Sequence, residues 1–198
     1  MSPPPPYNLG FTASSLGAAH TFALASVYLR LGDWDLAKQE AIAGNVFKQT
    51  KATSIARLAR EFRLRLQTLT ENQLRLLVES PSEAQVPISL LAVFKRYTLI
   101  RDFASSVLKE KALAVDFELR PSDYASFIEE QEPSHPELND LSDSSAQKLR
   151  QVTLRILTEG GILSESTPKR IAPTILADSV VDVIDSEDPS LLRPFLQS

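Results

Sequence analysis

A long apolar run covers residues 86–113 and constrains the fold more than any other feature of the sequence. Apolar side chains such as Leu90, Phe94 and Ile100 occur densely along it. The length and density of the run predict a central core helix, or two helices end to end. Pro87 should interrupt or kink that helix near its start, because proline removes a backbone donor. No run approaches the roughly 20 apolar residues that a membrane helix needs.

Further helices are predicted on both sides of this run, so the fold class is mainly α. Their boundaries are marked by the Gly32-Asp33 stop, by the capping-box spacing of Thr70 and Gln73, and by Ser80-Pro81-Ser82-Glu83. Asp143 is the predicted cap of a late helix that Gly160-Gly161 ends. The predicted helices cover about residues 14–31, 34–47, 53–69, 70–80, 122–130, 144–159 and 177–184.

The expected domain division is linear. Residues 1–10 are a Pro-rich, flexible lead-in, residues 11–131 a compact helical N-terminal domain, residues 132–142 an acidic, Pro-containing linker, and residues 143–198 a smaller C-terminal lobe. In that lobe the stretches ILSEST and KRIAPTIL predict a short β-hairpin around Thr167-Pro168. Helix, glycine turn and hairpin follow one another as in a winged-helix unit, and a plain helical lobe is the alternative.

The charge of the chain is unevenly distributed. The net charge is −4, yet residues 1–120 carry 15 Lys and Arg against 11 Asp and Glu, whereas residues 121–198 carry 6 against 14. There is no cysteine, and the start lacks the basic and apolar regions of a secretory signal. We therefore expect a cytoplasmic protein that does not enter the membrane.

The segment from Lys48 to Arg65 is basic in this otherwise acidic chain, and it includes most of the amphipathic helix predicted at about residues 53–69. Arg57, Arg60 and Arg63 lie opposite an apolar face, and Arg65 lies at the boundary between the two faces. Thr53 and Ser54 are the expected N-caps. Arginines on an exposed helix face suit phosphate contacts, while a solvated face without a ligand is the alternative. The candidate nucleic-acid-binding residues are Lys48, Lys51, Arg57, Arg60, Arg63 and Arg65. A second, weaker candidate surface contains Lys148, Arg150, Arg155, Lys169 and Arg170.

Nothing in the sequence predicts an enzyme. His20 lies on an apolar helix and His135 in a Pro-flanked loop, so neither is placed as a general base. The glycines form no phosphate-binding or dinucleotide-binding fingerprint, and His, Cys and carboxylates show no zinc-ligand spacing. We expect no catalytic residues, no metal site and no cofactor.

Several ordered blocks resemble the BrxA family. They are GFTASSL, VYLRLGDWD, AREFRLRL, KRYTLIRDFASSVLKEK, the Asp123-Tyr124 pair, HPEL and KLRQVTLRILTEGGIL. BrxA is the small helical component of BREX phage-defence systems. The resemblance, over about residues 8–195, implies an all-helical cytoplasmic protein, similar in part to the NusB fold, that binds DNA and acts with other BREX components.

Three functions remain open from the sequence. The leading hypothesis is a non-catalytic, accessory DNA-binding protein of a BREX system, which contacts the phosphates of double-stranded DNA with little sequence preference. The alternatives are an adaptor that binds other BREX components and a NusB-like RNA-binding module.

Overall fold

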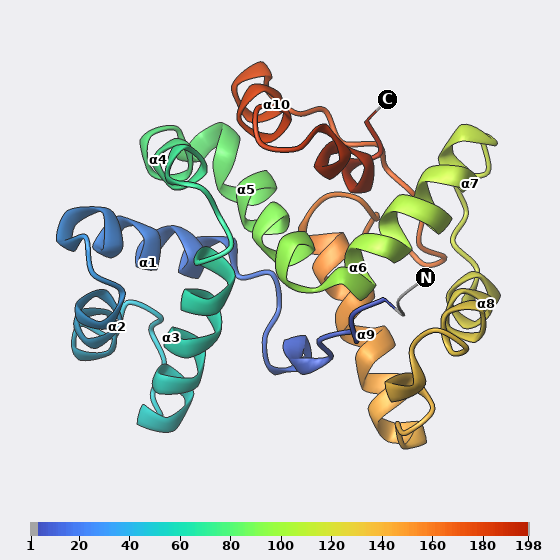
Figure 1. Cartoon of the computed structure of the whole chain (residues 1–198), viewed down its shortest axis with the longest axis horizontal. Coiled ribbons are helices and arrows are strands. Elements are labelled where there is room, and N and C mark those ends of the chain that lie inside the picture. Colours follow the sequence, from blue (N-terminus) through green and yellow to red (C-terminus); the bar gives the residue numbers. More distant parts are fainter. Residues whose placement is uncertain (1–3, 198) are drawn as a thin grey trace. The chain divides into compact units, whose positions relative to one another are not determined.

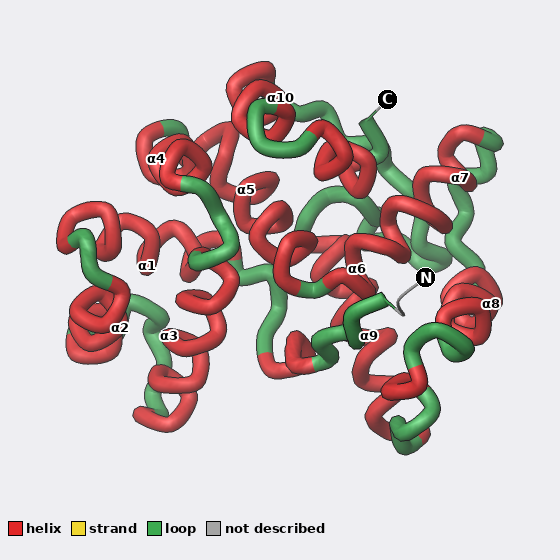
Figure 2. The backbone as a smooth tube through the Cα atoms, in the orientation of Figure 1, coloured by secondary structure: helices red, strands yellow, loops and turns green. Residues whose placement is uncertain are grey.

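The computed structural model describes residues 4–197, and this part of the chain consists of helices joined by loops (Figure 1, Figure 2). The mainly α fold class is confirmed. The chain forms two compact units, each assembled from segments that are separated in sequence. The described residues of unit 1 are 4–15, 97–175 and 190–197, and those of unit 2 are 16–96 and 176–189.

Unit 2 is a helical bundle whose connections follow familiar capping rules. Gly32 takes the left-handed conformation, with φ of 69°, and its N–H bonds the carbonyl of Tyr28, which ends the first helix. The Asp33 carboxylate then accepts from the next two free amides and begins the second helix. The α-helices of this unit are α1 (Ala18–Leu31), α2 (Trp34–Ala43), α3 (Ala52–Leu66), α4 (Glu71–Glu79), α5 (Pro81–Arg96) and α10 (Asp178–Asp185).

The long apolar run is divided between helices of the two units. α5 ends at Arg96 and α6 begins at Thr98, so the prediction of two successive helices is confirmed. α5 runs through Pro87, however, and the predicted interruption there is wrong. The lost backbone bond costs about 3 kcal/mol, whereas each large apolar side chain buried after it contributes about 1.5–3 kcal/mol. Ile88, Leu90 and Leu91 are all fully buried.

Unit 1 is built around an aromatic cluster. The ring of Phe103 lies 5.1 Å from that of Tyr124 and 5.2 Å from that of Phe127. Between α6 and α7 the helix widens into a π-helical turn, and π-helical turns occur often at functional sites. The elements are a 3-10 helix (Gly10–Ala13), α6 (Thr98–Phe103), the π-turn (Ala104–Leu108), α7 (Lys109–Leu113), α8 (Pro121–Gln131), a 3-10 helix (Pro136–Leu138), α9 (Asp143–Glu159) and a last 3-10 helix (Pro189–Phe195).

Tyr7 ties the N-terminal segment into unit 1. Residues 1–3 of the predicted lead-in lie outside the described residues. Tyr7 is only 6% exposed, its ring stacks on that of His135 at 3.7 Å, and its hydroxyl donates to Asp102 and Gln131. The predicted linker 132–142, which contains His135, lies between α8 and α9 within unit 1. The compact units are thus discontinuous, while the linear domain division stays a prediction.

The end of the chain departs from the sequence-based expectation in detail. The two hairpin segments pair antiparallel only through the bridge of Leu163 with Ile171, and residues 4–197 contain no strand (Figure 2). Ser142, rather than Asp143, caps α9, because its hydroxyl accepts from the amide of Ser145. Within residues 4–197, every helix is too short or too polar to cross a membrane.

Candidate nucleic-acid interface

The basic helix α3 lies in unit 2 and packs against α1, α2 and α5 (Figure 1). Ala59, Phe62 and Leu66 form its buried face, as the apolar spacing predicts. Gly17, just before α1, takes a φ of 60°, and a Cβ there would lie 2.4 Å from the Phe62 ring. Glycine therefore allows the close approach that fixes the buried side of α3.

α3 begins at Ala52, one residue earlier than predicted, and its first turn has no side-chain cap. Lys51 is the N-cap residue in an extended conformation, and its carbonyl accepts from the amides of Ser54 and Ile55. Thr53 and Ser54 lie inside the helix, so their assignment as N-caps is wrong. No side chain caps this N-terminus. Helix N-termini of this kind attract anions, because their free amides and the helix dipole favour negative charge.

Four of the six candidate cations are exposed near the start of α3. Lys48, Lys51, Arg57 and Arg60 are each classed among the exposed residues of unit 2. Arg57 and Arg60 are three residues apart and so share one helix face. Between residues 48 and 67 the sequence contains one acid, Glu61, and its side chain is only 11% exposed. The exposed surface of this segment is therefore positive.

Arg63 lies farther along α3 and is partly committed to an internal contact. Its side chain is 22% exposed, and its guanidinium donates to the carboxylate of Asp35 on α2. This hydrogen bond, together with the positive charge of Arg63, lowers the pKa of Asp35 below its ordinary value. The pair is exposed on the Asp35 side, so a competing anion could reach Arg63.

Arg65 is buried and cannot contact a phosphate in this conformation. Its side chain is 1% exposed, and its Nε donates to Glu61 Oε1 at 2.8 Å. A terminal nitrogen of the same guanidinium donates to the carbonyl of Leu16 at 3.2 Å, and the group lies over the Phe62 ring. The spacing of Glu61 and Arg65, four residues apart, was the sequence signal for this pair.

The second candidate surface lies in unit 1, on α9 and the loop after it. Lys148, Arg155 and Arg170 are exposed. Arg150 is half-buried, and the ammonium group of Lys169 donates to the carbonyl of Ser164. This surface therefore offers fewer free cations than its sequence suggests.

The two histidines are packed side chains. His20 contacts the carbonyl of Phe47 at 3.2 Å and lies against the rings of Phe47 and Phe62. His135 is 5% exposed between Tyr7 and Glu137. Among residues 4–197, no group of three or more His, Cys, Asp and Glu side chains is arranged to hold a metal ion.

Comparison with known proteins identifies the family. The BrxA family model matches residues 5–188. BREX protein BrxA of Bacillus cereus (strain H3081.97) is 27% identical over 133 residues, which are 67% of this chain and 66% of that protein. BREX protein BrxA of Escherichia coli O9:H4 (strain HS) is also 27% identical over 133 residues, 67% of this chain and 62% of the relative. The matched region thus spans slightly less than two thirds of each relative.

A solved structure supports the fold. The crystal structure of an uncharacterized protein from Magnetospirillum magneticum superposes with a TM-score of 0.82 at 20% identity, covering 96% of this chain and 98% of that one. At this identity the likeness bears on the fold alone. The family match extends over almost the whole chain, and the chain therefore belongs to the BrxA family.

Proposed function

We propose that this protein is a non-catalytic, cytoplasmic accessory component of a BREX-type phage-defence system that binds double-stranded DNA. The contacts are made to the phosphate backbone by Lys48, Lys51, Arg57, Arg60 and Arg63. Arg65 is left out of this set, because its guanidinium is buried against Glu61. The family relatives are named as BREX proteins, which supports the phage-defence role.

The main support for DNA binding is the exposed positive surface at the start of α3. Its cations project from one segment of an acidic protein, and the one acid of residues 48–67 is buried. The uncapped N-terminus of α3 adds a favourable position for one phosphate. Backbone contacts of this kind give affinity without sequence preference.

The test is the binding of a labelled random-sequence duplex across a series of salt concentrations. If all five cations contact phosphates, a plot of log affinity against log salt has a slope of about −4 to −5. Arg57→Ala with Arg60→Ala should flatten the slope by about 2 and weaken binding about tenfold or more at low salt. The melting temperature should stay unchanged, because both side chains are exposed.

A matched control removes two exposed arginines elsewhere in unit 2. Arg30 and Arg75 are 58% and 55% exposed and pair with Glu40 and Glu71. Arg30→Ala with Arg75→Ala makes the same change in net charge and should leave the slope unchanged. Equal weakening by the two double variants would place the DNA contacts outside α3.

An adaptor role is the second candidate, supported by the acidic surface at the end of unit 2. Asp178, Asp182 and Asp185 are exposed on α10. Such a surface fits a basic region of another BREX component. A pull-down of BREX components that survives nuclease treatment would favour this role over DNA bridging. Competition between duplex DNA and RNA would separate the leading proposal from a NusB-like RNA-binding module.

A further inference from the structure

Helix α9 of unit 1 has an outer side whose charge differs from that of the sequence around it. Residues 121–198 contain 14 acids against 6 Lys and Arg, yet residues 144–158 contain no acid and three of those six cations. The inner side of the helix is packed into unit 1, where Leu149, Val152 and Ile156 are buried. α9 is therefore a firmly held helix whose outer side is free of negative charge from residue 144 onwards.

The outer face of α9 is a row of exposed polar side chains. At about 100° per residue they fall within an arc of about 100°. They are Ser144, Gln147, Lys148, Gln151 and Arg155. Every residue from 142 to 148 is exposed, so the first two turns of α9 project from unit 1. An open pocket of about 470 Å³ lies along this face and is lined in part by Gln147, Lys148 and Gln151.

The hydrogen-bonding groups of this face are available to a ligand. Among residues 4–197, neither Gln147 nor Arg155 makes a side-chain hydrogen bond or an ion pair. The carboxamide oxygen of Gln151 accepts a long bond of 3.4 Å from Lys148, which leaves the NH₂ group of Gln151 free. Two carboxamides and one guanidinium group are therefore exposed together on one helix face.

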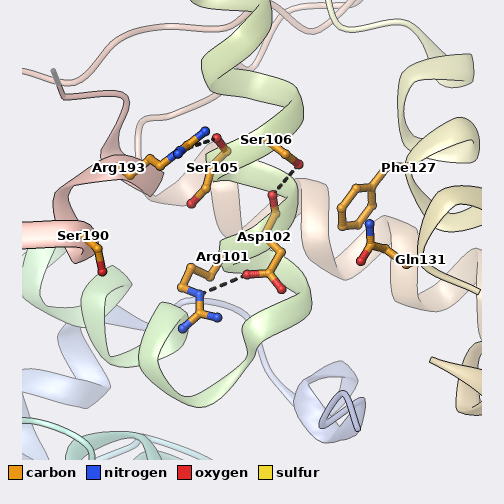
Figure 3. A pocket seen from close by; sticks show the side chains of 8 residues that line it. All are labelled: Arg101, Asp102, Ser105, Ser106, Phe127, Gln131, Ser190 and Arg193. Atoms are coloured by element: carbon orange, nitrogen blue, oxygen red, sulfur yellow. Dashed lines mark hydrogen bonds and ion pairs between the residues drawn. The ribbon is translucent and has the colours of Figure 1, made fainter. Parts of the chain in front are cut away.

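The pocket of about 480 Å³ beside the π-turn offers less to a ligand (Figure 3). Its lining includes Arg101, Gln131 and Arg193. Arg101 Nε donates to Asp102 and Arg193 Nε donates to the carbonyl of Ser105, and the two guanidinium groups point in different directions. The outer face of α9 is thus the stronger candidate for recognition in unit 1.

The side chains of this face are of the kinds that read the edges of bases. A glutamine carboxamide makes a pair of bonds to adenine N6 and N7, and an arginine guanidinium makes a pair to guanine O6 and N7. Gln147, Gln151 and Arg155 follow one another at intervals of four residues, which is about 6 Å along the helix axis. Base pairs are stacked about 3.4 Å apart, so the three side chains span about four to five base pairs.

The loop after α9 provides a further contact. The amide of Ser164 donates to the carbonyl of Arg170 at 2.8 Å, and the amide of Ala172 donates to the carbonyl of Ile162 at 2.9 Å, so residues 162–172 form a hairpin-like loop. Arg170 and the tip of the loop, residues 165–168, are exposed. An exposed arginine beside a reading helix is suited to a phosphate at the edge of the groove.

We propose that α9 enters the major groove of duplex DNA and reads base pairs through Gln147, Gln151 and Arg155. This inference rests on the proposed duplex binding and adds a sequence preference to it, because base contacts specify whereas phosphate contacts position. Asp140 and Asp143 are exposed at the start of α9 and repel phosphates, which places the contacts in the turns that follow. Duplex RNA is not the target, because side chains cannot read its deep, narrow major groove.

The experiment is selection of a random-sequence duplex library by the full chain, followed by sequencing of the retained DNA. The expected result is an enriched site of about four to five base pairs that contains adenine and guanine. Fluorescence anisotropy then compares this duplex with a scrambled duplex of the same composition. The enriched duplex should bind about 100-fold more tightly, since each paired base contact contributes about tenfold or more.

Variants of α9 test which side chains carry the preference. Gln147→Ala with Gln151→Ala should reduce it about tenfold or more and leave the affinity for the scrambled duplex within about twofold. Arg155→Lys keeps the charge but loses the paired donors, so it should also reduce the preference. The matched control, Gln39→Ala with Gln67→Ala, removes two exposed glutamines of unit 2 and should leave the preference unchanged.

The outcomes separate this inference from the proposed function. Retained DNA without an enriched sequence would overturn reading by α9 and leave phosphate binding intact. A preference that stays the same in all the α9 variants would also contradict the inference, whereas a library that is not retained at all would remove the proposed duplex binding itself. Arg57→Ala with Arg60→Ala should weaken the enriched and scrambled duplexes equally, which is the opposite pattern to that of the α9 variants.

Discussion

The two halves of α3 carry the same side chain at opposite depths. Arg57 and Arg60 are exposed to solvent, whereas Arg65, five residues after Arg60, is buried with Glu61 and the Leu16 carbonyl. The exposed guanidinium groups of the first half are available to a partner, whereas the guanidinium group of Arg65 is bonded inside the bundle. The comparison teaches that arginine number alone does not define an interface, because depth decides which guanidinium is available.

The largest expected effect is on the buried half. Arg65→Met removes the guanidinium that pairs with the buried Glu61 carboxylate and should lower the free energy of unfolding by about 3–5 kcal/mol. Urea unfolding monitored by circular dichroism measures this change. The double variant Glu61→Leu with Arg65→Met should recover most of the loss, because no uncompensated charge remains. A loss below about 0.5 kcal/mol for Arg65→Met would remove the contrast between the two halves.

Charge reversal tests the exposed half. Arg57→Glu with Arg60→Glu should weaken duplex binding about 100-fold at low salt, because two phosphate contacts become repulsive. The free energy of unfolding should change by no more than about 0.5 kcal/mol, as is usual for exposed positions. Fluorescence anisotropy with the labelled duplex and urea unfolding measure the two quantities. Unchanged DNA binding would make this half an ordinary solvated face.

Arg63 is intermediate in exposure between Arg60 and Arg65, and its ion pair with Asp35 limits its availability to a phosphate. Asp35→Asn removes the carboxylate that holds the Arg63 guanidinium, so duplex binding should become a few-fold tighter. The same anisotropy titration measures the change in affinity.

The matched control for the lost negative charge is Asp178→Asn, at an exposed acid of α10. Asp33 is not used for this control, because its side chain caps α2. Equal tightening in both variants would indicate a general charge effect.

The smallest expected effect is the pH dependence of the Asp35 and Arg63 pair. Arg63 holds the pKa of Asp35 below the value of 3.8 that applies without the pair. The contribution of the pair to stability is therefore present above that pH and is lost as the pH falls through the lower pKa of the folded state. The melting temperature of the wild-type protein minus that of Asp35→Asn should be constant above about pH 5 and shrink below it. A constant difference down to about pH 2 would contradict this assignment.

Local signals in the sequence predicted most of the helices. The Thr70 and Gln73 capping box is present in full, and Gly160 ends α9 as expected. The apolar spacing also identified the buried face of α3, including Phe62 and Leu66. These features depend on residues a few positions apart, where spacing alone carries the information.

Features that depend on distant residues escaped prediction. The depth of Arg65 follows from the carbonyl of Leu16, which is 49 residues away in sequence. The pocket beside the π-turn is lined by Arg101, Gln131 and Arg193, which share no motif. The continuation of α5 through Pro87 depends on how much apolar surface the helix buries afterwards. Sequence spacing reports none of these tertiary effects.

The anchoring of Tyr7 has a consequence for the order in which the chain folds during synthesis. Its partners Asp102, Gln131 and Glu137 follow it by 95, 124 and 130 residues. At about 5–20 residues per second, a ribosome needs several seconds or more to deliver them. In that interval α1 to α5 can pack against one another, because they are close together in the sequence. Tyr7 has by then left the exit tunnel, but its partners in unit 1 have not yet been synthesised. Folding of the two units therefore begins in the opposite order to their first appearance in the chain.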